Sequence, residues 1–227
     1  MSYSKIEKAY LLLGLSLVFA IRLLLFGQDT NPPGDDPGMH SGFIYLILKH
    51  AQLPEVNPYH MPGTPFTYPP AFHLLSGAVT LVADLPIVKT VFLLGLLLSI
   101  SLAIPLYAFA KTVTKSVPIS LCTMFLFATS IPDLYMMCWG GFVNIFALFF
   151  IYSLLWLAVK EHSSSWKLTV PMSVLAGALF LAHQLSLLVY LALLVFSYVF
   201  ITIYYFLKRF SKWEISSFIT KTIVSTS

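Results

Sequence analysis

Two adjacent carboxylates and a histidine follow the first apolar run of this 227-residue chain, in the segment NPPGDDPGMH at residues 31–40. Asp36 precedes Pro37, a pattern that predicts a helix with Asp36 as its N-cap and Pro37 as its first residue. A carboxylate at such a place can also act as a general base, or bind a hard divalent cation that holds a phosphate. Capping leaves lone pairs on the carboxylate, so both interpretations of Asp35 and Asp36 stay open.

The composition places this segment in a membrane protein. The chain is 58% hydrophobic and only 10% charged, and its mean hydropathy is +0.86. A soluble domain carries more charge than this on its surface. The formal net charge of +4 comes from short basic clusters between apolar runs. Such clusters are typical of membrane proteins, in which they set the orientation of the helices, so nucleic acid is excluded as a partner. Cys122 and Cys138 are interpreted as small, buried apolar side chains.

Six apolar runs each approach the roughly 20 residues that cross a bilayer. They lie at about residues 9–27, 87–110, 117–132, 141–159, 168–183 and 185–207. The first run also has the basic start of a signal peptide, but its length and the lack of a small-residue cleavage site predict a retained anchor. The one long loop, residues 28–86, is rich in Pro and Gly.

The stretch from residue 69 to 86 decides the topology. Only about 15 apolar residues separate Pro70 from Pro86, so we expect a helix at about 70–85 that lies in the membrane interface. With this stretch left out of the spans, the basic clusters all fall on the cytoplasmic side, at Lys5, Lys8, Lys111, Lys115, Lys160, Lys167, Lys208, Arg209 and Lys212. The acidic residues fall outside, at Asp29, Asp35, Asp36, Glu55, Asp84 and Asp133.

A second interfacial helix is predicted at about residues 37–51. Its stripe of Met39, Phe43, Leu46 and Ile47 suits a helix that lies on the membrane. Residues 1–227 are therefore predicted to form a single all-α transmembrane domain, with about six spans and two interfacial helices in the first extracytoplasmic loop. The Asp35–Asp36 pair, the turn at Asp133 and the turn at His183–Gln184 then open to the same face, as a site requires.

Several of these segments resemble motifs of the GT-C superfamily, membrane glycosyltransferases that include oligosaccharyltransferases and protein mannosyltransferases. The segments are GDDPGMH, TYPPAFH and SIPDLYMMCWGG, while WGGFVNIFAL and LFLAHQLSLLV resemble related archaeal membrane proteins. In the family pattern, a catalytic Asp in the first outer loop is often followed four residues later by a His, as Asp36 and His40 are here. Asp133 matches the acid of the second outer loop, and Tyr68 begins the aromatic-Pro-Pro turn.

The resemblance implies an enzyme that transfers a sugar from a polyprenyl-phosphate donor to an acceptor on the extracytoplasmic side. It implies three catalytic carboxylates, Asp36, Asp35 and Asp133, of which Asp36 and Asp133 would also hold a divalent cation (Mg²⁺ or Mn²⁺) if one is used. The substrate-binding residues would be His40, Tyr68, His73, Arg22, His183 and Gln184. The plasma membrane, or the ER membrane in a eukaryote, is the expected location, with membrane lipids as partners.

Simpler interpretations of the same residues stay open. Asp133 follows Pro132 and can be an N-cap. His183 can simply be a polar residue of the turn between two helices. Arg22 lies about 7–8 Å from the outer end of its span, so we favour snorkelling of its side chain to the headgroups. The single acid in the second loop favours an alternative function, a non-catalytic membrane subunit or lipid-binding protein that keeps the GT-C architecture. GT-C modules have at least seven helices, which implies that this chain is the N-terminal part of a longer protein or has a partner subunit.

Overall fold

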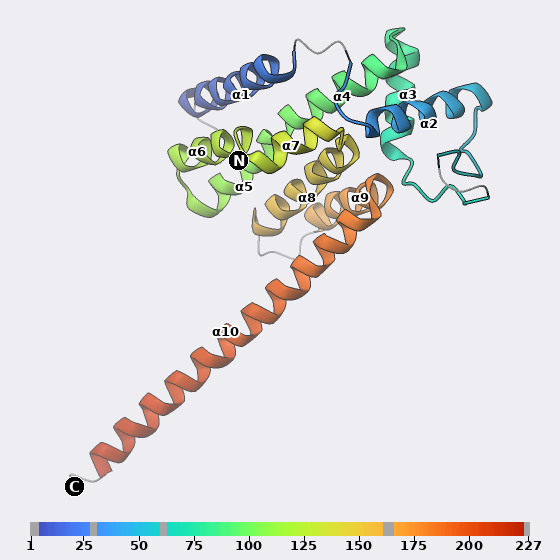
Figure 1. The fold of residues 1–227 in the computed structure, drawn as a ribbon. Coiled ribbons are helices and arrows are strands. Elements are labelled where there is room, and N and C mark those ends of the chain that lie inside the picture. Colours follow the sequence, from blue (N-terminus) through green and yellow to red (C-terminus); the bar gives the residue numbers. More distant parts are fainter. Residues whose placement is uncertain (1–4, 28–30, 60–62, 161–165, 225–227) are drawn as a thin grey trace. The chain divides into compact units, whose positions relative to one another are not determined.

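The computed structural model describes residues 5–27, 31–59, 63–160 and 166–224, and helices occupy all six predicted apolar runs (Figure 1). The chain divides into two units, Met1–Ser186 and Leu187–Ser227. In the described part, five helical segments are long and apolar enough to cross a membrane: Lys5–Phe26, Ile87–Thr114, Val117–Trp139, Phe142–Lys160 and Gln184–Arg209. The fifth predicted span is a shorter helix, α9 (Trp166–Ala182). An all-α membrane protein is thus confirmed, and the number of crossings stays a prediction.

The second predicted span is interrupted near its middle. It consists of α4 (Ile87–Ser101) and α5 (Ala103–Thr114). Pro105 has no N–H for the carbonyl of Ser101, four residues earlier, and its ring crowds that carbonyl. The carbonyl of Leu98 accepts both the N–H of Leu102 at 3.1 Å and the hydroxyl of Ser101 at 2.7 Å. The helical hydrogen bonding of the span is therefore interrupted where proline removes one bond.

The third predicted span is broken in the same way. It consists of α6 (Val117–Ala128) and α7 (Ile131–Trp139). Pro132 cannot donate to the carbonyl of Ala128, four residues earlier, so α6 ends there and a new helix begins. Gly140 ends α7 in the left-handed region at φ 84°, which glycine adopts without steric cost.

One central helix, α8 (Phe142–Lys160), packs against α4, α5, α7 and α9. Its buried residues include Phe142, Val143 and Ile145, which form one core with side chains from the neighbouring helices. The last helix, α10 (Gln184–Val224), begins in the first unit. Its part in the second unit is apolar on all sides through residue 207, and most of its large side chains are exposed, as expected for a helix surrounded by membrane.

Both helices predicted in the first loop are present, as α2 (Asp36–His50) and α3 (Ala71–Ala83). The 13 residues of α3 rise about 20 Å, which is short of the roughly 30 Å hydrocarbon core. Phe72 at the start of α3 meets Phe146 in the second turn of α8, with ring centroids 6.3 Å apart. The end of α3 leads directly into α4 (Figure 1). Both ends of α3 therefore lie at the same end of the helix bundle.

The predicted membrane-facing stripe of α2 is wrong for two of its residues. Phe43 is fully buried and Ile47 nearly so, inside the protein instead of in the interface. The rings of Tyr59 and Phe66, from the loop after α2, lie 5.2 and 4.9 Å from the ring of Phe43. That loop is held by a backbone bridge between Val56 and Pro65, so the loop itself covers the face that the sequence assigns to lipid.

Cys122 and Cys138 are exposed on the surfaces of α6 and α7, so their prediction as buried side chains is wrong. In a membrane span an exposed small apolar side chain faces lipid and needs no protein cover. Asp29, assigned to the outside, lies outside the described residues.

We predict opposite effects for alanine at two helical glycines. A Cβ at Gly95 on α4 would overlap the ring of Phe142, which is fully buried, so Gly95→Ala should destabilise the protein by roughly 1–3 kcal/mol. A Cβ at Gly177 on α9 meets no atom within 4 Å, so Gly177→Ala should be neutral or stabilise by up to about 1 kcal/mol. Thermal unfolding of the detergent-solubilised variants measures both changes, and equal shifts for the two would contradict this packing.

Candidate functional site

Neither Asp35 nor Asp36 caps α2 through its side chain. Asp35, not Asp36, occupies the N-cap position of α2, and its side chain makes no capping hydrogen bond. The helix begins one residue earlier than predicted because the N–H of Gly38 bonds to the backbone carbonyl of Asp35 at 3.1 Å. The prediction of Asp36 as N-cap is therefore wrong, and both carboxylates keep their oxygens for another partner.

Two glycines, Gly34 and Gly140, form a close contact between this loop and the end of α7, the glycine seat. Gly34 and Gly140 both have φ 84°, in the left-handed region. A Cβ at Gly34 would lie 2.6 Å from the backbone of Trp139, and a Cβ at Gly140 would overlap the ring of Pro37. Both positions therefore require glycine for conformation and for space. The residues on either side of the Asp35–Asp36 pair are held directly against the last turn of α7.

Asp36 lies in a setting that favours its neutral form. The side chain is half-buried, whereas Asp35 is exposed. Burial raises the pKa of Asp36 above its ordinary value, and the neighbouring charge of Asp35 raises it further. Burial, with a smaller contribution from the charge of Asp36, raises the pKa of Tyr68 to about 12. Asp36 and the Tyr68 hydroxyl therefore share one electrostatic environment, in which the carboxylate binds a proton more readily than in water.

A buried pair of histidines lies next to this carboxylate. His40 follows Asp36 by four residues on α2, so both occupy the same face of the helix. Its Nδ1 lies 3.1 Å from Nε2 of His73 on α3, and both histidines are fully buried. The ring of Tyr68 lies 5.6 Å from that of His40 and 5.4 Å from that of His73. The structure thus brings together four residues that the sequence predicted for the site, from α2, α3 and the turn between them.

Both histidines of this pair are neutral near pH 7. Burial lowers the pKa of His40 to about 3, with a further contribution from His73. Burial also lowers the pKa of His73 to about 4, against an opposing effect of the Pro69 carbonyl. This carbonyl favours a proton on Nδ1 of His73, although no hydrogen bond of regular geometry forms there. By this inference Nε2 of His73 accepts from Nδ1–H of His40, and Nε2 of His40 keeps its lone pair.

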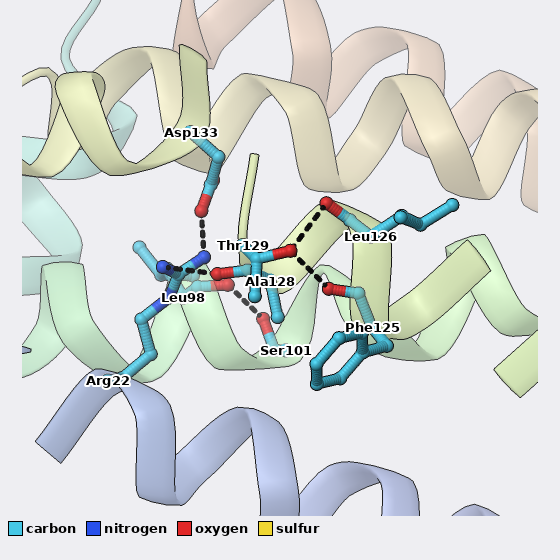
Figure 2. A network of polar contacts seen from close by, with 8 residues as sticks. All are labelled: Arg22, Leu98, Ser101, Phe125, Leu126, Ala128, Thr129 and Asp133. Atoms are coloured by element: carbon cyan, nitrogen blue, oxygen red, sulfur yellow. Dashed lines mark hydrogen bonds and ion pairs between the residues drawn. The ribbon is translucent and has the colours of Figure 1, made fainter. Parts of the chain in front are cut away.

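A buried ion pair joins α1 (Lys5–Phe26) to the start of α7 (Figure 2). The guanidinium of Arg22 pairs with the carboxylate of Asp133, and its Nη1 donates to the carbonyl of Ala128 at 3.0 Å. This carbonyl is the one that Pro132 leaves without a helical donor. Arg22 has no exposed surface, so the snorkelling prediction is wrong, because the broken helix offers the guanidinium a carboxylate and a free carbonyl inside the protein.

Asp133 serves this ion pair and does not cap its helix. It is the third residue of α7, and Ser130 occupies the N-cap position, so the N-cap interpretation is wrong. Oδ1 of Asp133 and Nε of Arg22 are buried without a hydrogen-bond partner in the described part of the chain. Each such group costs about 1–3 kcal/mol. Removing one charge of a buried pair costs about 3–5 kcal/mol, since the other is then left alone.

The two predicted acidic motifs lie apart. Gly140 follows Asp133 by seven positions, which corresponds to roughly 10 Å along α7, and the loop of Asp36 packs at the Gly140 end. The structure records no contact between Asp36 and Asp133. Within the described ranges no group of three or more His, Cys, Asp or Glu residues has the geometry of a metal site. A divalent cation held by these two residues stays a prediction.

The His183–Gln184 turn has a structural role that its sequence did not reveal. Nδ1 of His183 accepts the backbone N–H of Ser186 at 3.3 Å and lies 2.7 Å from its hydroxyl. His183 thereby caps the first turn of α10, and partial burial lowers its pKa. Gln184 is exposed. The substrate-binding roles predicted for both residues stay predictions.

Sequence reasoning missed the residues that position the site. Gly34 and Gly140 seat the loop, and the available signal was a glycine directly beside each motif, in PPGDD and WGGF. The covering rings of Tyr59 and Phe66 were also missed, because aromatic residues in a loop have no periodicity that assigns them to a core.

The fold and the site define a polytopic helical membrane protein with a carboxylate–histidine cluster in the loop between α1 and α4. Comparisons with protein family models, with curated proteins and with solved structures find no match for this chain. A proposal for the function of this chain therefore has to start from the chemistry of these residues.

The histidine pair predicts a loss of stability in acid. The folded pKa values of about 4 and about 3 for His73 and His40 lie below the ordinary 6.5, so the unfolded chain binds more protons below pH 6.5. Stability should be complete above about pH 7 and should fall as the pH drops from 6.5 toward 4. Thermal unfolding across this range measures the effect.

The double variant His40→Gln/His73→Gln should lose most of this pH dependence. His50→Gln, at the exposed end of the same helix, is the control and should keep it. A wild-type unfolding temperature that stays level from pH 7 to 4.5 would contradict a neutral, buried pair.

Proposed function

We propose that this protein is a GT-C-like glycosyltransferase that transfers a sugar from a polyprenyl-phosphate donor to an acceptor on the extracytoplasmic side. The observation that supports it best is the state of Asp36: a half-buried carboxylate, free of capping and fixed at the start of α2. Its pKa is raised, which suits a general base, because such a base must be deprotonated and still accept a proton.

The proposed reaction is an in-line displacement at the anomeric carbon. Asp36 accepts the proton of the acceptor hydroxyl while the acceptor oxygen forms its bond to that carbon. The bond between the anomeric carbon and the phosphate oxygen breaks, and the lipid phosphate leaves with the electron pair. His40, one turn further along α2, holds the acceptor through the lone pair of its Nε2, and His73 fixes its orientation from the other side.

Arg22 does not supply the charge that the leaving phosphate needs in this proposal. Its guanidinium is buried and already bound to Asp133 and to the carbonyl of Ala128. Tyr68 is better suited, since a pKa of about 12 keeps its hydroxyl protonated as a donor at neutral pH. In this proposal Asp133 has a positioning role instead of the predicted catalytic one. Its ion pair fixes α7, and the glycine seat at the end of α7 positions the loop that carries Asp36.

A second candidate is a non-catalytic membrane subunit or lipid-binding protein with the same architecture. The ion pair favours it, because Arg22 and Asp133 neutralise each other instead of facing a substrate. Under this candidate the histidine pair and the glycine seat only stabilise the loop.

Asp36→Asn separates the two candidates. The change keeps the shape and removes the base, so transfer should fall by about 10²–10⁴-fold with little change in folding. The assay measures transfer from a radiolabelled polyprenyl-phosphate sugar in membranes that contain matched amounts of each variant. The matched control is Asp84→Asn, because Asp84 is exposed and its left-handed conformation suits Asn equally well.

Full transfer by both Asp36→Asn and Asp35→Asn would show that these carboxylates are not catalytic. If membranes with the wild-type protein transfer no more sugar than membranes without it, the second candidate replaces the first.

A further inference from the structure

The residues of the proposed reaction are enclosed by aromatic rings in this structure. His40 and His73 have only 1% and 0% of their surface exposed, so an acceptor hydroxyl cannot reach Nε2 of His40. The rings of Tyr68 and Phe72 lie 5.6 and 5.8 Å from the ring of His40. The rings of Tyr68 and Phe66 lie 5.4 and 6.5 Å from the ring of His73. Some of these rings must therefore move before a substrate binds.

Tyr68 and Phe66 belong to the loop that connects α2 to α3. The structure describes two arms of this loop, residues 55–59 and 63–68, and we call these arms the strap. Backbone hydrogen bonds of 2.9 Å join the arms, from the N–H of Asn57 to the carbonyl of Thr64 and from the N–H of Phe66 to the carbonyl of Glu55. Both bonds lie within the strap, so they stay intact when it moves as one unit.

The strap rests on α2 through two aromatic contacts. The rings of Tyr59 and Phe66 lie 5.2 and 4.9 Å from the buried ring of Phe43. Asn57 is the only buried residue of the two described arms, and Tyr59 is 49% exposed. A segment with so few buried side chains separates from the body of a protein at a smaller free-energy cost than a core element does.

A glycine of α2 makes room for one of these contacts. A Cβ at Gly42 would overlap the hydroxyl group of Tyr59, so the tyrosine ring lies directly against the helix backbone. Glycine inside a helix is less favourable than alanine, and the position of Tyr59 gives a reason for it here. A Cβ at Gly38, one turn earlier on α2, meets no atom within 4 Å. Of these two glycines, only Gly42 is needed for the strap to close.

We propose that the strap is a lid over the reaction site, which opens to admit the acceptor to His40 and closes to bring the Tyr68 hydroxyl to the leaving phosphate. Closure of such a lid excludes water from the site and completes the set of reacting groups. The lid serves the proposed reaction and so rests on the proposed function, whereas its movement is measured without any sugar.

Chemical labelling of the histidines with diethyl pyrocarbonate tests this lid. The reagent acylates accessible, neutral imidazole nitrogens, and mass spectrometry of the purified, solubilised protein gives the rate at each histidine. We expect fast labelling of the exposed His50. Labelling of His40 and His73 should be slower, but it should proceed while the protein stays folded, because the lid opens transiently.

Gly42→Ala should increase the labelling rate of the histidine pair. The added Cβ displaces the ring of Tyr59 and thereby removes one of the two contacts with Phe43. We expect an increase of about fivefold, the factor that corresponds to about 1 kcal/mol of aromatic packing. Gly38→Ala, on the same helix, is the matched control and should leave the rates unchanged.

Phe66→Ala removes the other contact with Phe43 and should give a similar increase. The unfolding temperature of Gly42→Ala should stay close to that of Gly38→Ala, since only the closed lid is weakened. A histidine pair that stays unlabelled in the folded wild-type protein, or equal labelling rates in the two glycine variants, would overturn the lid. An increase in labelling that comes only with a lower unfolding temperature would overturn it as well.

The same labelling separates a failure of the lid from a failure of the reaction. If the histidine pair is labelled as expected while the wild-type protein transfers no sugar, the proposed reaction fails and the movement of the strap is supported. If the wild-type protein transfers sugar while the histidine pair stays unlabelled, the lid fails and the reaction is supported.

Discussion

A buried guanidinium constrains the whole first unit. Arg22 lies within an apolar span, where an unpaired charge costs about 2.5–3.5 kcal/mol even on the insertion scale that gives the smallest values. It cannot face lipid without a partner, and Asp133 and the carbonyl of Ala128 provide one (Figure 2). That carbonyl is available only because Pro132 breaks the third span. The carbonyl that Pro132 leaves without a donor therefore accepts a hydrogen bond from the buried cation Arg22.

The site depends on this contact through one short helix. The ion pair fixes the beginning of α7, and the end of α7 carries Gly140, against which the ring of Pro37 packs. Pro37 follows Asp36 directly, so the position of the carboxylate follows from that of α7. His40 then lies one turn along α2 and meets His73 of α3. The Arg22–Asp133 pair fixes α7, and α7 in turn positions the Asp36–His40–His73 cluster, which is the site of the proposed reaction.

Hydrophobic pattern and proline positions predicted the helices well, and long-range pairing was not predictable in the same way. The apolar runs predicted a helix in each predicted span and both loop helices, because membrane thickness and proline geometry act locally. The interruptions near Leu102 and Thr129 and the extension of α10 to Val224 were not predicted. Nothing local to Arg22 shows that a carbonyl 106 residues later lacks a donor. The resemblance to GT-C motifs named Asp36, His40, Tyr68 and His73 as site residues, but it did not predict that the two histidines pack against each other. The glycine seat was missed, since a tight contact between distant segments leaves no periodicity in the sequence.

The most direct test of this account is a double-mutant cycle on the stability of the solubilised protein, with Arg22→Met, Asp133→Leu and both together. Asp133→Leu alone leaves a buried cation and should cost about 3–5 kcal/mol of unfolding free energy. The double variant should be more stable than Asp133→Leu, since only the donor to the Ala128 carbonyl is then missing, at about 1–3 kcal/mol. Two single effects that simply add in the double variant would contradict the claim that this pair holds α7 in place.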